Sequence, residues 1–139
     1  MSEGYLWDDD AYHQIQQAGV YFQRCPVTAD IEAIKIGECL RGWTKMNYFR
    51  RPLTTVRQLI AFCPSPRPRP IEEALKVLFA SHRLVLDTGP FENQVSEELF
   101  AVMPVESWLR RMGFVSGKHG VPAIIDAEEM ELRLGLPNA

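Results

Sequence analysis

The stretch TTVRQLIAFCPSPRPRPIEEALKVLFASHRLVLDTGPFENQVSEELFAVM, residues 54–103, decides the fold that the sequence predicts. It reads as a helix, a turn, a second helix and two extended runs. The second helix is the clearest of these, because five apolar side chains recur at the spacing of a helix that lies on a core. They are Ile71, Ala74, Leu75, Leu78 and Phe79. We therefore predict a helix over residues 70–83 with this apolar stripe buried.

Two extended runs follow this helix. Residues 84–86 form the first run, and after a break at Gly89 and Pro90 residues 99–103 can return beside it as the second strand of an antiparallel hairpin. Four apolar residues in this region also fit helical spacing, so a helix is the alternative to the second strand. They are Val95, Leu99, Val102 and Met103.

Two further helices are expected earlier in the chain. An apolar stripe made of Ala33, Ile36, Leu40 and Trp43 predicts the first, over residues 30–43. The other begins at residue 54 or 55 and runs through residue 60. Residues 63–69 then alternate proline with other residues, which holds Arg67 and Arg69 in an extended turn. This turn either presents the two arginines to phosphate groups or is only a rigid spacer.

The flanking segments are also expected to be largely helical. A short helix should end near Ala18. Residues 20–22 either form a strand or are apolar side chains that pack this segment against the core. Beyond residue 103 the pattern predicts, in order, a helix over residues 104–113, a short strand over residues 123–125, and a helix capped by Asp126 with Glu129 that ends near Gly135.

The fold class predicted from these elements is α+β: one mostly helical domain over residues 1–139 with a small antiparallel β-hairpin. Within it we expect an N-terminal extension (1–27), a core (28–103) and a C-terminal helical segment (104–139). Hydrophobic residues make up 46% of the chain and charged residues 24%, which is typical of a folded globular domain.

Several observations favour the cytoplasm and argue against a membrane partner. No apolar run approaches the roughly 20 residues that span a bilayer, and acidic residues stand where a secretory signal needs basic ones. Cys25, Cys39 and Cys63 are odd in number and widely spaced, with no C-x-x-C pair. We predict that they are free thiols packed as small hydrophobes, as in a reducing compartment.

Charge is distributed unevenly along the chain. Residues 35–83 hold ten basic and three acidic side chains, a net of +7, whereas the segments before and after them each carry −5. Such a central segment attracts phosphates or an acidic protein surface. The alternative is that the charges interleave on a solvated surface. A connector also places basic side chains beside aromatic ones, at Lys45, Arg50 and Arg51. These side chains can contact nucleic acid, or the aromatic ones pack on the core while the basic ones are solvated.

The apolar register of residues 56–60, 71–79 and 84–86 resembles the winged helix-turn-helix superfamily of bacterial and phage regulators, over about half of the chain. In members that bind DNA, the second helix enters the major groove and the wing touches the backbone. The resemblance implies that the core, 28–103, is winged-helix-like and binds double-stranded DNA in transcription regulation. It gives this role to Arg67, Arg69, Lys76, Arg83 and the wing tip at residues 90–93.

Two carboxylates speak against DNA contact by this helix. Glu72 and Glu73 stand where a recognition helix first meets the groove, and only cytosine N4 offers a carboxylate a useful donor there. The alternative function is therefore a winged-helix protein-interaction module, an adaptor or inhibitor whose basic surface meets an acidic protein partner and which contacts no nucleic acid.

No catalytic motif is present in the sequence. There is no phosphate-binding glycine loop, nucleophile with a base, or metal-ligand cluster, and Asp9 with His13 supplies only two ligands. We predict that the protein is not an enzyme, with no catalytic residues, no cofactor and no metal.

A single winged helix contacts only a small surface, and members that bind DNA often pair to span two half-sites, so we also consider a homodimer. The candidate contact is the helix over residues 104–113, where Trp108 would be the anchor with Met112 beside it and Phe114 beyond. The alternative is that this apolar stripe packs the helix against its own core.

Overall fold

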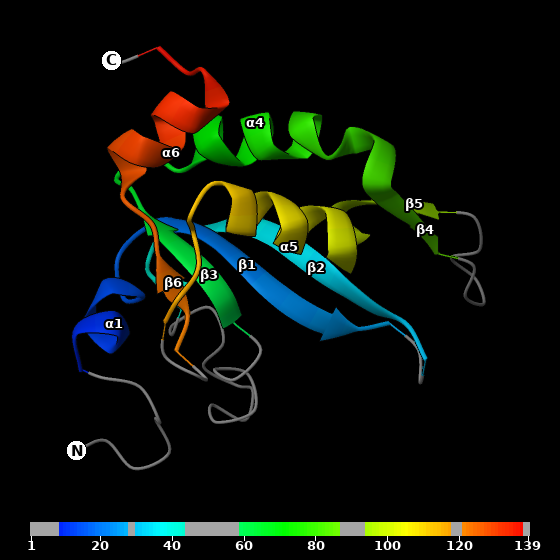
Figure 1. Ribbon diagram of the computed structural model, residues 1–139, viewed down its shortest axis with the longest axis horizontal. Helices are drawn as coiled ribbons and strands as arrows, with labels where there is room; N and C mark the ends of the chain where they lie inside the picture. Colours follow the sequence, from blue (N-terminus) through cyan, green and yellow to red (C-terminus); the bar gives the residue numbers. More distant parts are fainter. Residues whose placement is uncertain (1–8, 28–29, 44–58, 87–93, 118–120, 138–139) are drawn as a thin grey trace.

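The computed structural model describes residues 9–27, 30–43, 59–86, 94–117 and 121–137. These residues form a six-stranded mixed sheet and four α-helices (Figure 1). The strands are β1 (Gly19–Pro26), β2 (Glu32–Cys39), β3 (Leu59–Pro64), β4 (Arg83–Leu86), β5 (Gln94–Ala101) and β6 (Ala123–Ile124). The helices are α1 (Asp9–Gln14), α4 (Arg69–Leu78), α5 (Val102–Arg111) and α6 (Ala127–Leu134), with a 3-10 turn, η1 (Ala80–His82).

The sheet has the strand order β4-β5-β2-β1-β3-β6. β1 and β2 form an antiparallel hairpin along their full lengths, from the pair Gly19 and Cys39 to the pair Pro26 and Glu32. β3 and β5 extend this hairpin on its two sides, β3 antiparallel to β1 and β5 antiparallel to β2. β6 pairs with β3 and runs parallel to it. The hairpin of β1 and β2 is therefore the centre of the sheet, although β1 belongs to the segment expected to be an N-terminal extension.

The predicted fold class, a mostly helical winged helix with a small hairpin, is wrong. The segment expected to be the first helix, 30–43, contains β2, and Leu59 and Ile60 of the next expected helix lie in β3. Residues 54–58 lie outside the described part of the chain. β2 has neighbouring strands on both sides and is buried on both of its faces, so its buried positions do not alternate with exposed ones. Without alternation, part of their spacing matches a helix by coincidence.

The predicted elements that follow residue 68 are largely confirmed. α4 occupies most of the range 70–83, and β4 pairs antiparallel with β5, as expected of the hairpin. β5 ends at Ala101, so Val102 and Met103 belong to α5 and not to the strand. Leu78 is 45% exposed, which contradicts its predicted burial. Ile71, Leu75 and Phe79 are four residues apart and share the buried face, and Leu78 lies at the margin of that stripe.

Helix ends in the C-terminal part follow the local signals. Gly113, with φ 78°, stands two residues beyond the end of α5. The Asp126 carboxylate accepts a hydrogen bond from the backbone N–H of Glu129 at 3.1 Å and so caps α6, as predicted. Gly135 ends that helix with φ 70°, a backbone conformation that favours glycine.

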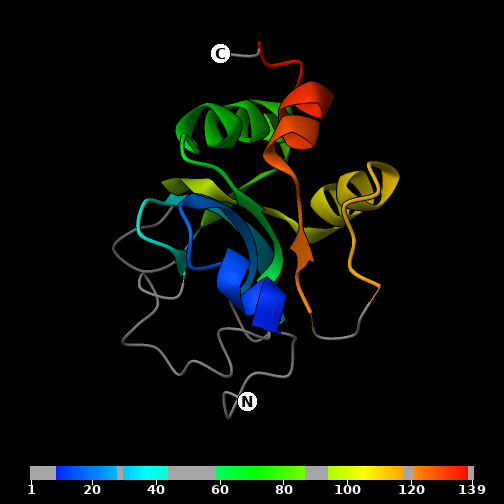
Figure 2. The same ribbon diagram turned by 90° about the vertical axis from the view of Figure 1, so that its left-hand side faces the viewer.

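The three helices α4, α5 and α6 cover one face of the sheet (Figure 2). Their apolar side chains form a core with those of the strands, and Trp108 of α5 packs edge-on against Phe79 with ring centroids 5.8 Å apart. α1 and Trp43 cover part of the other face, where Ile15 and Phe62 lie in a second cluster. The sheet is thus buried on both sides at its centre.

The three thiols are free, as predicted, with Cys39 and Cys63 buried and Cys25 half-buried. Among the helices that the structure describes, none is long and apolar enough to cross a membrane.

Candidate functional site

The structure separates the basic residues that the sequence grouped. Lys45, Arg50 and Arg51 lie outside the described residues. Arg67 and Arg69 lie at the N-terminal end of α4, and Arg83 begins β4 beyond its C-terminal end. A helix of ten residues, about 15 Å long, lies between Arg69 and Arg83, so these described residues do not form one basic patch.

Two of the four described candidates for phosphate contact are paired with carboxylates of the same chain. The Nη2 atom of Arg69 lies 3.0 Å from Oε1 of Glu38, and the Nζ atom of Lys76 lies 2.9 Å from Oε1 of Glu72. The side chains of Lys76 and Glu72 are only 16% and 12% exposed. Lys76 is therefore held inside the fold by Glu72, a pairing that the i, i+4 spacing in the sequence already allowed.

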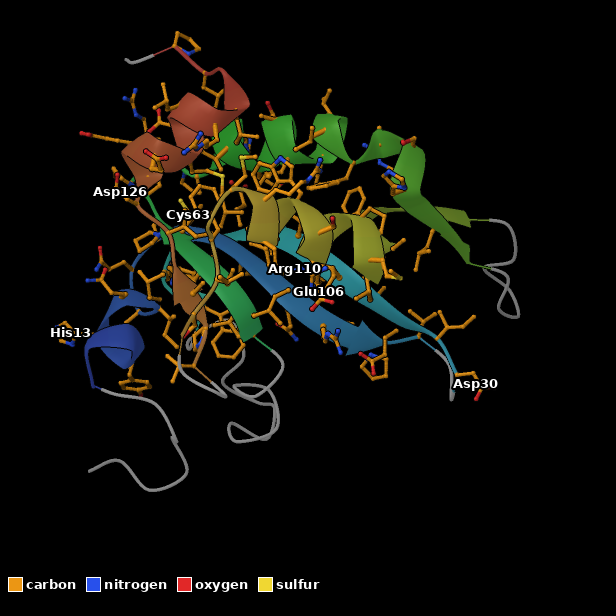
Figure 3. All side chains as sticks on the ribbon, in the orientation of Figure 1. His13, Asp30, Cys63, Glu106, Arg110 and Asp126 are labelled. Atoms are coloured by element: carbon orange, nitrogen blue, oxygen red, sulfur yellow. The ribbon has the colours of Figure 1, made fainter. Side chains whose placement is uncertain are left out.

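Other charges interleave in the same way. Nη2 of Arg24 donates to both carboxylate oxygens of Glu106, at 2.9 and 3.1 Å, and links β1 to α5. Figure 3 labels Glu106 on α5. In the described part of the chain, Arg67 and Arg83 make no such ion pair, and the Nε atom of Arg83 is buried without a hydrogen-bond partner. Two of the ten basic side chains of residues 35–83, Arg69 and Lys76, thus pair with carboxylates of the same segment, Glu38 and Glu72.

A cleft of about 550 Å³ lies between α6 and the turn that leads into α4. Its two sides come from residues 65–71 and residues 126–137, which are distant in the sequence. Apolar and charged side chains line it together. The lining consists of Ser65, Pro66, Arg67, Pro70, Ile71, Asp126, Ala127, Glu128, Glu131, Leu136 and Pro137.

Local hydrogen bonds fix the first side of the cleft. The Ser65 N–H donates to the carbonyl of Ala18 at 2.8 Å, which ties the turn to the start of the sheet. The Ser65 hydroxyl accepts from the backbone N–H of Arg67 at 3.2 Å. Pro68 then caps α4, and the fixed φ of the prolines keeps this segment rigid. Of the two arginines in this turn, Arg67 lines the cleft, whereas Arg69 turns to Glu38.

The second side of the cleft depends on both ends of α6. Asp126 caps its start, and beyond its end the N–H of Leu136 donates to the carbonyl of Glu131 at 2.9 Å. This hydrogen bond closes the helix in the manner of a Schellman motif and directs Leu136 into the cleft.

The cleft is acidic. Asp126, Glu128 and Glu131 face one cationic side chain, Arg67, which leaves two negative charges. Figure 3 shows Asp126 at the start of α6, near Cys63 of β3. Burial, and then the charges of Asp126 and Glu131, raise the pKa of Cys63 to about 12. This thiol therefore stays protonated at neutral pH, which disfavours it as a nucleophile.

The residues predicted as a dimer contact pack inside the chain. Trp108 and Phe114 are buried with ring centroids 5.9 Å apart, and Met112 is half-buried against the same core. For these three side chains the structure shows the alternative, packing of the helix on its own core. Dimerisation itself stays a prediction.

The sequence predicted Asp126 only as a helix cap, and it missed the cleft. No local pattern marks the cleft, because its sides come together only when α6 packs beside α4. Over the described residues, no group of three histidine, cysteine or carboxylate side chains could hold a metal ion. No protein-family model, curated protein or solved structure matches this chain.

Proposed function

We propose that the protein is a protein-interaction module, an adaptor or inhibitor that binds a segment of a partner protein in the cleft between residues 65–71 and α6. The observation that carries this proposal is the composition of the cleft. Apolar side chains such as Ile71 and Leu136 offer contact area, and a few charged groups can fix orientation, which is the usual make-up of a binding site.

The same charges disfavour duplex DNA as the partner. Phosphates would have to compete with Glu38 for Arg69 and with Glu72 for Lys76, and the three carboxylates of the cleft repel them. DNA binding through residues 35–83 remains the competing function, and its support is the +7 charge of that segment.

We also propose a cytoplasmic location and a binding role without catalysis. The free thiols support a reducing compartment. The raised pKa of Cys63, to which the charges of Asp126 and Glu131 contribute, supports a structural role for this thiol.

Affinity capture from an extract of the native host, with and without nuclease, tests this function. Leu136→Asp places a charge in the cleft, and Leu132→Asp is the matched control, because Leu132 is an exposed leucine of α6 that does not line the cleft. We expect the original protein and the control to retain the same nuclease-resistant partner and Leu136→Asp to lose it, with circular dichroism unchanged in both variants.

Two results would overturn the proposal. One is a captured partner that nuclease releases. The other is a labelled duplex DNA that binds at 50 mM salt and weakens steeply by 200 mM, as phosphate contacts require.

A further inference from the structure

We infer that the segment bound in the cleft is extended and basic, with an arginine or lysine beside an apolar side chain. This inference rests on the proposed function and adds the chemistry of the partner. It depends on three features of the cleft: its unpaired carboxylates, its apolar walls and the guanidinium of Arg67.

Among the glutamates whose side chains the structure describes, Glu128 and Glu131 of the cleft are unpaired, whereas most of the others are paired; Glu73, which is also unpaired, lies outside the cleft. Glu32, Glu38, Glu72, Glu106 and Glu129 each lie within ion-pair distance of a basic side chain. Glu128 and Glu131 make no hydrogen bond or ion pair through their side chains with any described residue. Their charge is therefore available to a cation from outside the chain.

The spacing of these two carboxylates suits one basic side chain. They are three residues apart on α6, so they lie on the same side of the helix with Cβ atoms about 5–6 Å apart. A guanidinium offers five N–H donors in a planar fork and can reach both carboxylates, which favours arginine over lysine.

The remaining lining defines the rest of the segment. Pro66, Pro70 and Pro137 present rigid apolar surface with no N–H to satisfy, and Leu136 adds a larger apolar contact. Arg67, on the opposite side, can donate to main-chain carbonyls, which an extended segment leaves free. A cleft of about 550 Å³ holds a few side chains, so a short segment fits it.

Charge complementarity thus selects the occupant. Three carboxylates against one guanidinium leave two negative charges, which a segment with two basic side chains neutralises. An acidic segment or a phosphate would meet the same carboxylates with repulsion.

Fluorescence anisotropy with model peptides tests the inference. The probe is a labelled seven-residue peptide with two arginines on either side of a leucine, and its matched twin carries glutamines in place of both arginines. At 50 mM salt we expect the arginine peptide to bind at least about tenfold more tightly than its twin, the equivalent of about 1.4 kcal/mol.

Variants of the protein locate the contact. Glu128→Lys changes an exposed side chain and should weaken the arginine peptide by about tenfold. Glu73→Lys is the matched control, because Glu73 is an exposed glutamate of α4 outside the cleft lining, and it should leave binding unchanged. Glu131→Gln removes one charge from the same site, so it should also weaken binding of the arginine peptide, by less than Glu128→Lys does. Circular dichroism checks that this variant is folded.

Equal binding of the two peptides, no binding of the arginine peptide, or equal loss in the Glu128 and Glu73 variants would overturn the inference. These results leave the proposed function standing if the nuclease-resistant partner is still lost on Leu136→Asp. If the partner is retained by that variant, the proposed function fails as well.

Discussion

Replacement of Lys76 by methionine should destabilise the protein, although the winged-helix resemblance implied that this lysine contacts DNA. Its Nζ atom lies 2.9 Å from Oε1 of Glu72, and both side chains are largely buried. Two unit charges at that distance attract by about 6 kcal/mol at an effective dielectric constant of about 20, but desolvation of both groups offsets most of this. Methionine keeps the apolar stem and has a similar helix propensity, so the variant tests the charge alone.

The expected loss of stability arises because the largely buried carboxylate of Glu72 would be left without its cationic partner. Exposed pairs contribute at most about 1 kcal/mol, whereas removal of one partner from a fully buried pair costs about 3–5 kcal/mol. With Lys76 16% exposed and Glu72 12% exposed, the pair is close to the buried limit, and water can still reach part of it. We therefore expect Lys76→Met to lower the free energy of unfolding by about 2–3 kcal/mol.

Urea unfolding followed by tryptophan fluorescence measures this loss, with the m-value as a check on the transition. Arg67→Met is the control, because Arg67 is exposed and makes no ion pair with a described residue, and it should change stability by less than about 0.5 kcal/mol. A double-mutant cycle with Glu72→Gln should give a coupling of about 1–2 kcal/mol. A loss below about 0.5 kcal/mol for Lys76→Met at an unchanged m-value would refute the buried pair and return Lys76 to the candidates for phosphate contact.

Three further predictions use the same unfolding assay. Leu75→Ala should cost about 2–5 kcal/mol because Leu75 is fully buried, and Leu78→Ala only about 1 kcal/mol because Leu78 is 45% exposed; equal losses would contradict the orientation of α4. Gly37→Ala should cost about 1–3 kcal/mol, because its Cβ would overlap the phenol ring and hydroxyl oxygen of the buried Tyr21, whereas Gly117→Ala, with open space around it, should be nearly neutral. Cys63 has a pKa raised from 9.0 to about 12. The protonated thiol therefore contributes fully to the free energy of unfolding below pH 9, and this contribution is lost as pH rises from 9 to 12. That loss should be smaller in Cys63→Ala, and equal pH profiles for the two proteins would show that the thiol is not buried as described.

Some features of this protein follow from its sequence alone, because their causes are local. The apolar repeat of residues 71–79 produced α4, and Gly135 and the carboxylate of Asp126 ended and capped α6 where the pattern placed them. Short-range hydrogen bonds and the freedom of glycine at positive φ decide such features within a few residues. The hairpin of β4 and β5 was also predictable from its apolar runs.

The central strands were decided only by the tertiary structure. β2 reads as helix by spacing, but β1 and β5 pair with its two edges and apolar clusters cover both of its faces, so its residues are buried without alternation. Burial on one face, as in α4, leaves a periodic signal, and burial on both faces removes it.

The arrangement of charge was likewise a tertiary outcome. The sequence shows ten basic side chains in residues 35–83, but it does not show that Glu38 meets Arg69 across the fold or that the carboxylates of α6 face Arg67 across a cleft. Net charge counts residues along the chain, whereas electrostatic interactions depend on distance in space and on access to water. For this reason the sequence predicted a basic surface, and the packing of α6 beside α4 produced an acidic cleft.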